Sequence, residues 1–263
     1  MADSKPSSKP NSQLQISRLE VADIDAAITT IQLAFAGDPF ADWIYDRSKF
    51  SPKRNHASLT IRMKWGMRNG HIYVAHTPER RCAGVAMWVG PKPLDEKPTW
   101  DDWWQDWMLW FRQLGMNTRF GRGGLKVERY YLWKESQSKL QSSVWTNPEG
   151  YWFCNILAIH PDCQGKGIGK KLMQEVFDIA DAEGVPCYLE SSKFEPNVKI
   201  YERMKFRFVS DIKCDDGNGT CTLFSMIRDA PAIKGGEDES TSESSEAEGS
   251  GKDVDILPDA VIP

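Results

Sequence analysis

The pattern of apolar and polar positions in the first half of the chain predicts one strand, two helices and a hairpin. Apolar steps of three and four indicate helices, and short apolar runs bounded by turn residues indicate strands. The elements we expect are a strand over residues 14–19, helices over 21–35 and 52–68, and strands over 71–75 and 82–89. Because the turn-rich segment 76–79 joins the last two runs, we expect an antiparallel hairpin there.

In the second half, strands and helices alternate. The run 150–159 is too continuously apolar for a half-exposed strand, so we expect it to be buried. A helical pattern starts near residue 170, and Gly184 and Pro186 end it. The remaining elements expected are a strand over 187–191, a helix over 195–204, and paired strands over 207–212 and 221–227.

Between these halves lies a helical segment rich in aromatic residues, from residue 99 to about 140, with a glycine-rich interruption at 115–124. Six aromatic residues recur at helical spacing: Trp100, Trp103, Trp104, Trp107, Trp110 and Phe111. The stripe predicts an amphipathic helix that packs on the domain. A second interpretation, compatible with the first, is that part of the stripe lines a pocket for an apolar or aromatic acceptor.

This order of elements is typical of a mixed α/β fold: an antiparallel first half is followed by a strand–helix–strand unit. We expect a single domain over residues 14–228, with the helical insertion at about 91–145. Residues 1–13 are expected to form a disordered leader. Residues 229–263 are Gly-, Ser- and acid-rich, which predicts a disordered acidic tail; a partner-binding role for it stays open.

Composition and charge exclude several classes of protein. A net charge of −4 gives no basis for nucleic-acid binding, and no apolar run approaches the length of a membrane span. The six cysteines have neither metal-ligand nor disulfide spacing. We therefore expect no bound metal and a reducing, cytoplasmic compartment.

A glycine-rich turn is the first feature that indicates chemistry. Gly165, Gly167 and Gly169 stand between an apolar strand and a helical pattern. Glycine lets backbone N–H groups approach an anion, and the N-terminus of a helix attracts negative charge. Since Lys166 and Lys170 add positive charge, the turn predicts a phosphate-binding site.

The spacing of these glycines separates the turn from other phosphate loops. A dinucleotide fingerprint needs a glycine where this chain has Lys170, and no frame provides the Gly-Lys-Ser/Thr of a P-loop. The sequence Gln-x-x-Gly-x-Gly at 164–169 instead resembles the pyrophosphate-binding motif of the GNAT superfamily of acyl-CoA-dependent N-acyltransferases. The resemblance implies the GNAT fold, whose central sheet is split, with acetyl-CoA entering where the fourth and fifth strands diverge.

A second segment carries the same resemblance. In GNAT enzymes an Asn four positions before a Tyr lies on a short helix beside the CoA sulfur. Asn197 and Tyr201 of this chain have the same spacing. By resemblance, Asn197 holds the pantetheine arm, Tyr201 protonates the departing thiolate, and a backbone N–H at or beside Leu157 polarises the thioester. The implied coenzyme-binding residues are Leu157, Ala158, Ile159, Gln164, Gly165, Lys166, Gly167, Ile168, Gly169, Lys170 and Asn197.

The base that deprotonates the amine is less evident from the sequence. Glu190 lies at the end of a predicted buried strand, where a carboxylate needs a hydrogen-bonding or charged partner. Glu190 is therefore our candidate for the base. A local hydrogen bond or ion pair is the alternative role for this residue. Glu128 and Glu135 on the inserted helix are further candidates, and a water chain without a dedicated base also stays open.

Between residues 157 and 206 the chain resembles puromycin N-acetyltransferase-like enzymes, with Lys205 standing where those enzymes usually have glycine. We therefore predict acetyl-CoA-dependent transfer of an acetyl group to the primary amine of a small molecule such as a drug, toxin, amino acid or polyamine. Attack is expected to be direct, in a ternary complex, by a monomer or homodimer. A protein or peptide acetyltransferase and a non-catalytic acyl-CoA sensor remain alternatives.

Overall fold

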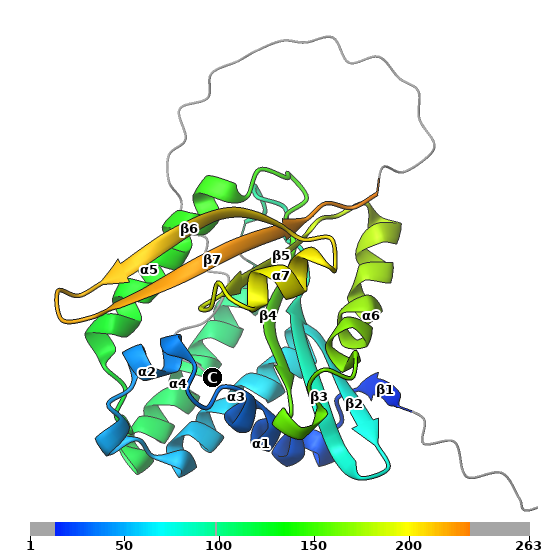
Figure 1. The fold of residues 1–263 in the computed structure, drawn as a ribbon. Helices are drawn as coiled ribbons and strands as arrows, with labels where there is room; N and C mark the ends of the chain where they lie inside the picture. Colours follow the sequence, from blue (N-terminus) through cyan, green and yellow to red (C-terminus); the bar gives the residue numbers. More distant parts are fainter. Residues whose placement is uncertain (1–13, 98, 232–263) are drawn as a thin grey trace, which may run out of the picture.

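A seven-stranded sheet forms the centre of the computed structural model, which describes residues 14–97 and 99–231 (Figure 1). The strand order is β1-β2-β3-β4-β5-β7-β6. Within the described sheet β4 and β5 run parallel, and every other neighbouring pair is antiparallel. The mixed α/β fold with an antiparallel first half, expected from the sequence, is confirmed.

The strands form where the sequence predicts them, with somewhat different ends. They are β1 Gln15–Arg18, β2 Gly70–Thr77, β3 Arg80–Val89, β4 Trp152–Ile159, β5 Cys187–Ser191, β6 Arg207–Asp215 and β7 Thr220–Arg228. The expected hairpin is β2–β3, and the expected pair of terminal strands is β6–β7.

Helices connect and cover these strands. They are η1 Val21–Asp23, α1 Ile24–Ala34, α2 Pro39–Ile44, η2 Arg47–Lys49, α3 Pro52–Asn69, α4 Trp100–Phe120, α5 Val127–Val144, η3 Pro161–Cys163, α6 Ile168–Glu183 and α7 Asn197–Glu202. The local sequence sets several of these ends. The Ser51 side chain accepts a hydrogen bond from the Arg54 N–H at the start of α3, and Gly184, with φ +69, ends α6.

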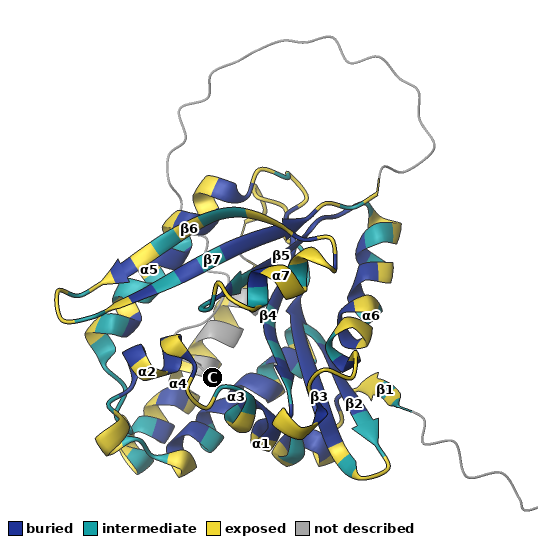
Figure 2. Ribbon diagram, in the orientation of Figure 1, coloured by how far each residue is buried: buried dark blue, intermediate teal, exposed yellow. Residues whose placement is uncertain are grey.

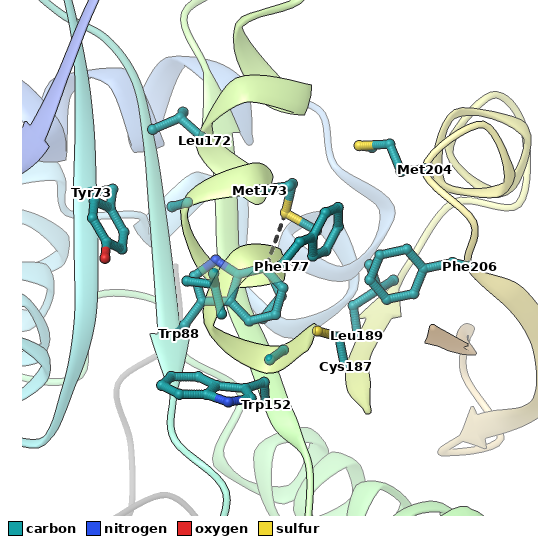
Figure 3. Packing of buried hydrophobic residues seen from close by; sticks show 14 of the residues in the cluster. Tyr73, Trp88, Trp152, Leu172, Met173, Phe177, Cys187, Leu189, Met204 and Phe206 are labelled. Atoms are coloured by element: carbon teal, nitrogen blue, oxygen red, sulfur yellow. Dashed lines mark hydrogen bonds between the residues drawn. The ribbon is translucent and has the colours of Figure 1, made fainter. Parts of the chain in front are cut away.

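Three apolar clusters fill the spaces between helices and sheet. On one face α6 packs on the central strands, where Met173 and Phe177 point toward Trp88 of β3 (Figure 3). On the other face α1 and α3 cover β2, β3 and the end of β4, while α2 packs on β7 and α5 packs on β6. The central strand β3 is consequently buried along most of its length, and β4 is buried or partly buried throughout (Figure 2).

The short helix α2 was not predicted from the sequence, although its start signal is present. The Asp38 side chain accepts a hydrogen bond from the Phe40 N–H at 3.0 Å, and Pro39 occupies the first helical position. Six residues are too few for the apolar spacing to distinguish a helix from a loop.

The inserted helices α4 and α5 lie between β3 and β4 in the sequence, as expected, but two expectations about α4 are wrong. Gly115 does not interrupt the helix, which continues to Phe120 and breaks at residues 121–124. The aromatic stripe does not pack on the domain. Its six members are between 44% and 85% exposed, and ring contacts link five of them: Trp100, Trp103, Trp107, Trp110 and Phe111. Among the described side chains of α4, Gln113 and Met116 are the buried ones, and α4 packs on α3.

The leader predicted for residues 1–13 lies outside the described residues, and so do residues 232–263 of the predicted tail. Across the described chain, no helix is long and apolar enough to cross a membrane.

Candidate active site

Strands β4 and β5 pair over a short length and then separate. Their register runs from Trp152↔Cys187 to Cys154↔Leu189, whereas β4 continues to Ile159. Beyond Cys154, β4 therefore keeps β3 on one side and has no described sheet neighbour on the other. Backbone N–H and C=O groups along such an edge can hydrogen-bond an extended ligand.

A β-bulge lies in β4 at the point of divergence. Met87 and Trp88, which are consecutive in β3, pair with Ile156 and Cys154, so Asn155 is an extra residue without a partner on β3. Residues two apart in a regular strand share a face. Here Cys154 packs in the α6 cluster and Ile156 in the α1–α3 cluster, because the bulge turns them to opposite faces.

The residues of β4 that were predicted to bind the coenzyme differ in the accessibility of their side chains. Leu157 and Ile159 are partly buried and pack with the α6 cluster. Ala158 is 1% exposed and faces α1 and α3 on the other side. Its side chain is therefore not available to a ligand, and Ala158 contributes backbone alone.

The glycine turn follows β4 directly and leads into α6. Gly165 and Gly167 have φ of +72 and +75, in the left-handed region that favours glycine. A Cβ added at either position would meet no atom within 4 Å, so both face open space. The helix begins at Ile168 without a side-chain cap, which leaves the N–H groups of its first turn for solvent or an anion.

The polar side chains of the turn are partly engaged with the chain itself. Lys166 Nζ donates to the Asp162 carbonyl oxygen at 2.8 Å, and Gln164 Nε2 donates to that of Ile159 at 3.3 Å. Lys170 is exposed on the first turn of α6. Residues 164–170 are thus gathered at the end of the open edge of β4, as a site for a diphosphate would require.

Asn197 begins α7 and is held against the end of β5. Its Nδ2 donates to Oγ of Ser191 at 2.9 Å. Four residues later, Tyr201 lies one turn along the same short helix. Lys205, just past the helix, has φ +68, in the left-handed region that favours glycine.

Tyr201 is partly buried in the α6 cluster and contacts Phe206 edge to face at 6.0 Å. Desolvation raises the pKa of its phenol above the ordinary 10.0, and the nearby Cys154 thiol and Asp38 carboxylate raise it further. The phenol is consequently protonated throughout the neutral range. Tyr201 packs against the same apolar cluster as Cys154, the last residue of β4 that pairs with β5.

The carboxyl group of Glu190 accepts hydrogen bonds from side chains and not from the local backbone. Its Oε2 accepts a hydrogen bond from Gln137 Nε2 at 2.5 Å, and its Oε1 accepts from Gln141 Nε2 at 3.0 Å and from the Tyr188 hydroxyl at 2.8 Å. Burial raises the pKa of Glu190, and the three donors partly oppose that rise. The carboxyl group is therefore better matched to accepting a proton near neutrality than an exposed glutamate.

The two other acidic candidates lie on the outer side of α5. Glu135 is exposed and pairs with Lys139 at 2.6 Å, which lowers the pKa of its carboxyl group. Glu128 is exposed as well. Of the carboxylates considered from the sequence, Glu190 alone adjoins the divergence of β4 and β5.

Asp38 also belongs to this region, although the sequence analysis gave it no role. It is 6% exposed, and both its oxygens accept from the Ser192 hydroxyl at 2.8 Å, just past β5. Lys193 Nζ lies 3.8 Å from Oδ2 and balances the charge. The available signal was Asp-Pro at a helix start, which predicts a cap and says nothing of tertiary neighbours.

The cysteines have the properties of structural residues. All six are unpaired and buried. Burial raises the pKa of Cys82 to about 11, and it raises the pKa of Cys154 and Cys187 as well. A buried thiol with a raised pKa is a poor nucleophile at neutral pH. Among the described residues, no group of three or more His, Cys, Asp or Glu side chains is placed to hold a metal ion.

Comparison with known proteins agrees with this geometry. Residues 128–208, from α5 through the divergent strands to β6, match the family model described as an acetyltransferase (GNAT) domain. The chain is 26% identical over 218 residues to an uncharacterized N-acetyltransferase of Schizosaccharomyces pombe, covering 81% of this chain and 82% of that protein. A second N-acetyltransferase of the same organism is 27% identical over 203 residues, covering 72% of this chain and 80% of that protein.

The fold has solved counterparts. A crystal structure described as histone acetyltransferase HPA2 and related acetyltransferase, from Corynebacterium glutamicum, superposes with a TM-score of 0.56. The match covers 84% of this chain and 98% of that one, at 20% sequence identity. At this identity the likeness concerns the fold alone, and it agrees with the split sheet described above.

Proposed function

We propose that the chain, whose residues 128–208 match the GNAT acetyltransferase family model, transfers the acetyl group of acetyl-CoA to the primary amine of a small molecule. The catalytic unit we propose is residues 14–228, with residues 91–145 as a helical insertion into it. Tyr201 is the proposed proton donor, and Glu190 is the proposed proton acceptor. The proposed coenzyme site consists of residues 157–159, 164–170 and Asn197.

The observation that carries this proposal is the separation of β4 from β5 directly before an uncapped, glycine-rich helix start. An extended pantetheine arm needs backbone partners, which the free edge of β4 offers beyond Cys154. A diphosphate needs converging N–H groups without obstructing side chains, and Gly165 and Gly167 meet no atom where a Cβ would stand. The residues present therefore fit this coenzyme.

The chemistry proposed is a direct displacement. When bound, acetyl-CoA supplies the acetyl thioester. The amine nitrogen forms a bond to the carbonyl carbon, the carbon–sulfur bond breaks, the amine loses one proton and the sulfur gains one. Glu190 accepts the amine proton, directly or through water, and burial makes it a stronger base by raising the pKa of its carboxyl group above the ordinary 4.5. Tyr201 provides the proton for the sulfur from a phenol that burial keeps protonated.

A small acceptor is favoured over a protein by the position of α5. Gln137 and Gln141 of this helix reach Glu190, so the inserted segment covers the carboxylate that would receive the amine proton. This cover restricts access to Glu190, and it supports a small acceptor, which needs less room beside α5 than a folded protein does.

The test is a titration of acetyl-CoA by calorimetry, followed by a CoA-thiol release assay over a panel of small amines and lysine peptides. We expect binding, and release with at least one small amine. No binding would overturn the proposal. Tight binding without release for any amine would identify an acyl-CoA sensor, and release with peptides alone would identify a protein acetyltransferase.

A further inference from the structure

One buried cation in this region has no counter-ion among the described residues. Arg62, in the middle of α3, is 6% exposed. Its Nη2 donates to Oδ1 of Asn155, the bulge residue of β4, and its buried Nε has no hydrogen-bond partner. No carboxylate of the described chain pairs with it. Tyr45 and Tyr130 are the ionisable side chains that interact with it electrostatically.

Burying a cation without a counter-ion is costly, so its surroundings need an explanation. Desolvation lowers the pKa of Arg62 to about 10, which still leaves the guanidinium charged at neutral pH. A structural role at the bulge would use the bond to Asn155 and would not need a free Nε. The remaining donors of a planar guanidinium match the two oxygens of a carboxylate.

The position of Arg62 relates it to Glu190. Cys154 and Leu189 are the last paired residues of β4 and β5, so Asn155 and Glu190 are the next residue in each strand. Both point to the face covered by α3 and α5, since Asn155 meets Arg62 of α3 and Glu190 meets Gln137 of α5. A guanidinium and a carboxyl group therefore flank the same divergence without pairing with each other.

We propose that the acceptor is an amino acid or another small amine that carries a carboxylate, that Arg62 binds this carboxylate, and that Glu190 faces the amine. This inference rests on the proposed N-acetyltransferase function and narrows its substrate class. Arg62 is a specificity-determining residue, and the reaction itself is unchanged. The separation of positive and negative groups across the site corresponds to the opposite charges of a zwitterionic acceptor.

A second buried arginine on α3 provides a matched control. Arg54 is 3% exposed, but its donors are used within the chain: Nε donates to the Gly121 carbonyl oxygen at 3.0 Å, and Nη2 donates to Asn117 Oδ1 at 3.1 Å. Replacing Arg54 removes a buried guanidinium from the same helix without touching Asn155. Any effect of Arg62→Gln on acceptor choice that Arg54→Gln lacks is then specific to the site.

The experiment compares acceptors that differ only in the carboxylate, such as phenylalanine and phenylethylamine, over several side chains, by CoA-thiol release at saturating acetyl-CoA. For its preferred side chain, the wild-type protein is expected to favour the carboxylate-bearing member by about 10- to 100-fold in kcat/KM, the effect of a charged hydrogen bond. Arg62→Gln should abolish this preference by raising KM for the acid member. Arg62→Lys should keep part of it, and Arg54→Gln should keep the ratio.

Inhibition of the wild-type protein provides a second test, which does not depend on whether the Arg62→Gln variant folds. Acids that lack the amine, such as 3-phenylpropionate for the phenylalanine pair, are expected to inhibit competitively against the amine acceptor. A wild-type preference for amines without a carboxylate, an unchanged ratio in Arg62→Gln, or no inhibition by any such acid would overturn the inference. Calorimetry with acetyl-CoA is done first, because loss of coenzyme binding refutes the proposed function itself, whereas binding without carboxylate preference refutes this inference alone.

Discussion

Gln137 of α5 donates a hydrogen bond from Nε2 to Oε2 of Glu190 on β5 at 2.5 Å, so a helix inserted between β3 and β4 closes over a carboxylate of a later strand. Gln141, one turn further, donates to the other oxygen at 3.0 Å. These two amides connect the inserted segment to the proposed site. They also oppose the rise in pKa that burial imposes on Glu190, because both stabilise the ionised form.

Replacing Gln137 by leucine should therefore move the pH dependence of the reaction. Without this donor the ionised form of Glu190 loses a stabilising partner, so its pKa rises further. If Glu190 is the base, the ascending limb of the kcat/KM profile shifts to higher pH while the plateau at high pH changes little. Gln174→Leu is the matched control, because Gln174 donates to Asp178 on the exposed side of α6. A limb that stays in place would remove Glu190 from the role of base.

The raised pKa of Glu190 also has a consequence for stability. Burial raises it above the ordinary 4.5, so the folded state keeps this proton to higher pH than the unfolded state. The stability gained from the bound proton is complete below pH 4.5 and is lost as the pH rises through the raised value. The free energy of unfolding of Glu190→Gln, minus that of the wild type, should thus increase with pH. Urea unfolding between about pH 4 and about pH 8 measures this difference, and a decrease with pH would contradict the assignment.

The sequence predicts the parts of the fold and site that depend on neighbours along the chain. The glycines at 165 and 167, the strand before them and the helix after them form one continuous segment, so local rules place them correctly. The pair Asn197 and Tyr201 is similarly a matter of one helical turn.

What the sequence does not predict depends on residues that are distant along the chain. Arg62 meets Asn155 only because a bulge turns the asparagine toward α3, and nothing in the local pattern marks that bulge. Asp38 reads as a helix cap, and its contact with Ser192 is a tertiary one. The prediction that the tryptophan stripe packs on the domain is wrong for a related reason. Spacing identifies one face of a helix, but it does not show whether that face contacts the core.

Gly167→Val is expected to weaken acetyl-CoA binding. The residue has φ +75, which strains any side chain, and the added side chain meets no protein atom, so its steric clash is with a ligand bound there. We expect the Kd to rise about 10- to 100-fold, the loss of a charge-assisted hydrogen bond. Gly217→Val is the control, since Gly217 has φ +78 and equally open surroundings in the β6–β7 turn. Calorimetry should show weakening in the first variant and not in the second. Equal affinities would place the diphosphate elsewhere.

The exposed stripe on α4 leads to a prediction about stability. Trp100 is 85% and Trp104 is 58% exposed, so replacing both by glutamine should change the free energy of unfolding by less than about 1 kcal/mol in total. Trp88, which is fully buried against α6, is the contrast: Trp88→Ala should cost about 3–5 kcal/mol. Urea unfolding compares the variants. A large loss in the double variant would show that the stripe packs against the protein after all.

Tyr201→Phe tests the proposed proton donor. The phenyl ring keeps the packing against Phe206, so the fold and the affinity for acetyl-CoA are expected to be retained. The hydroxyl proton is lost, and kcat should fall by roughly 10²–10⁴, the range typical of a positioned acid. Tyr131→Phe is the control, because Tyr131 is 59% exposed on α5. Since burial keeps the Tyr201 phenol protonated at neutral pH, the reduction in kcat should be similar from about pH 6 to about pH 8. A variant that turns over at the wild-type rate would mean that water, and not this phenol, protonates the departing sulfur.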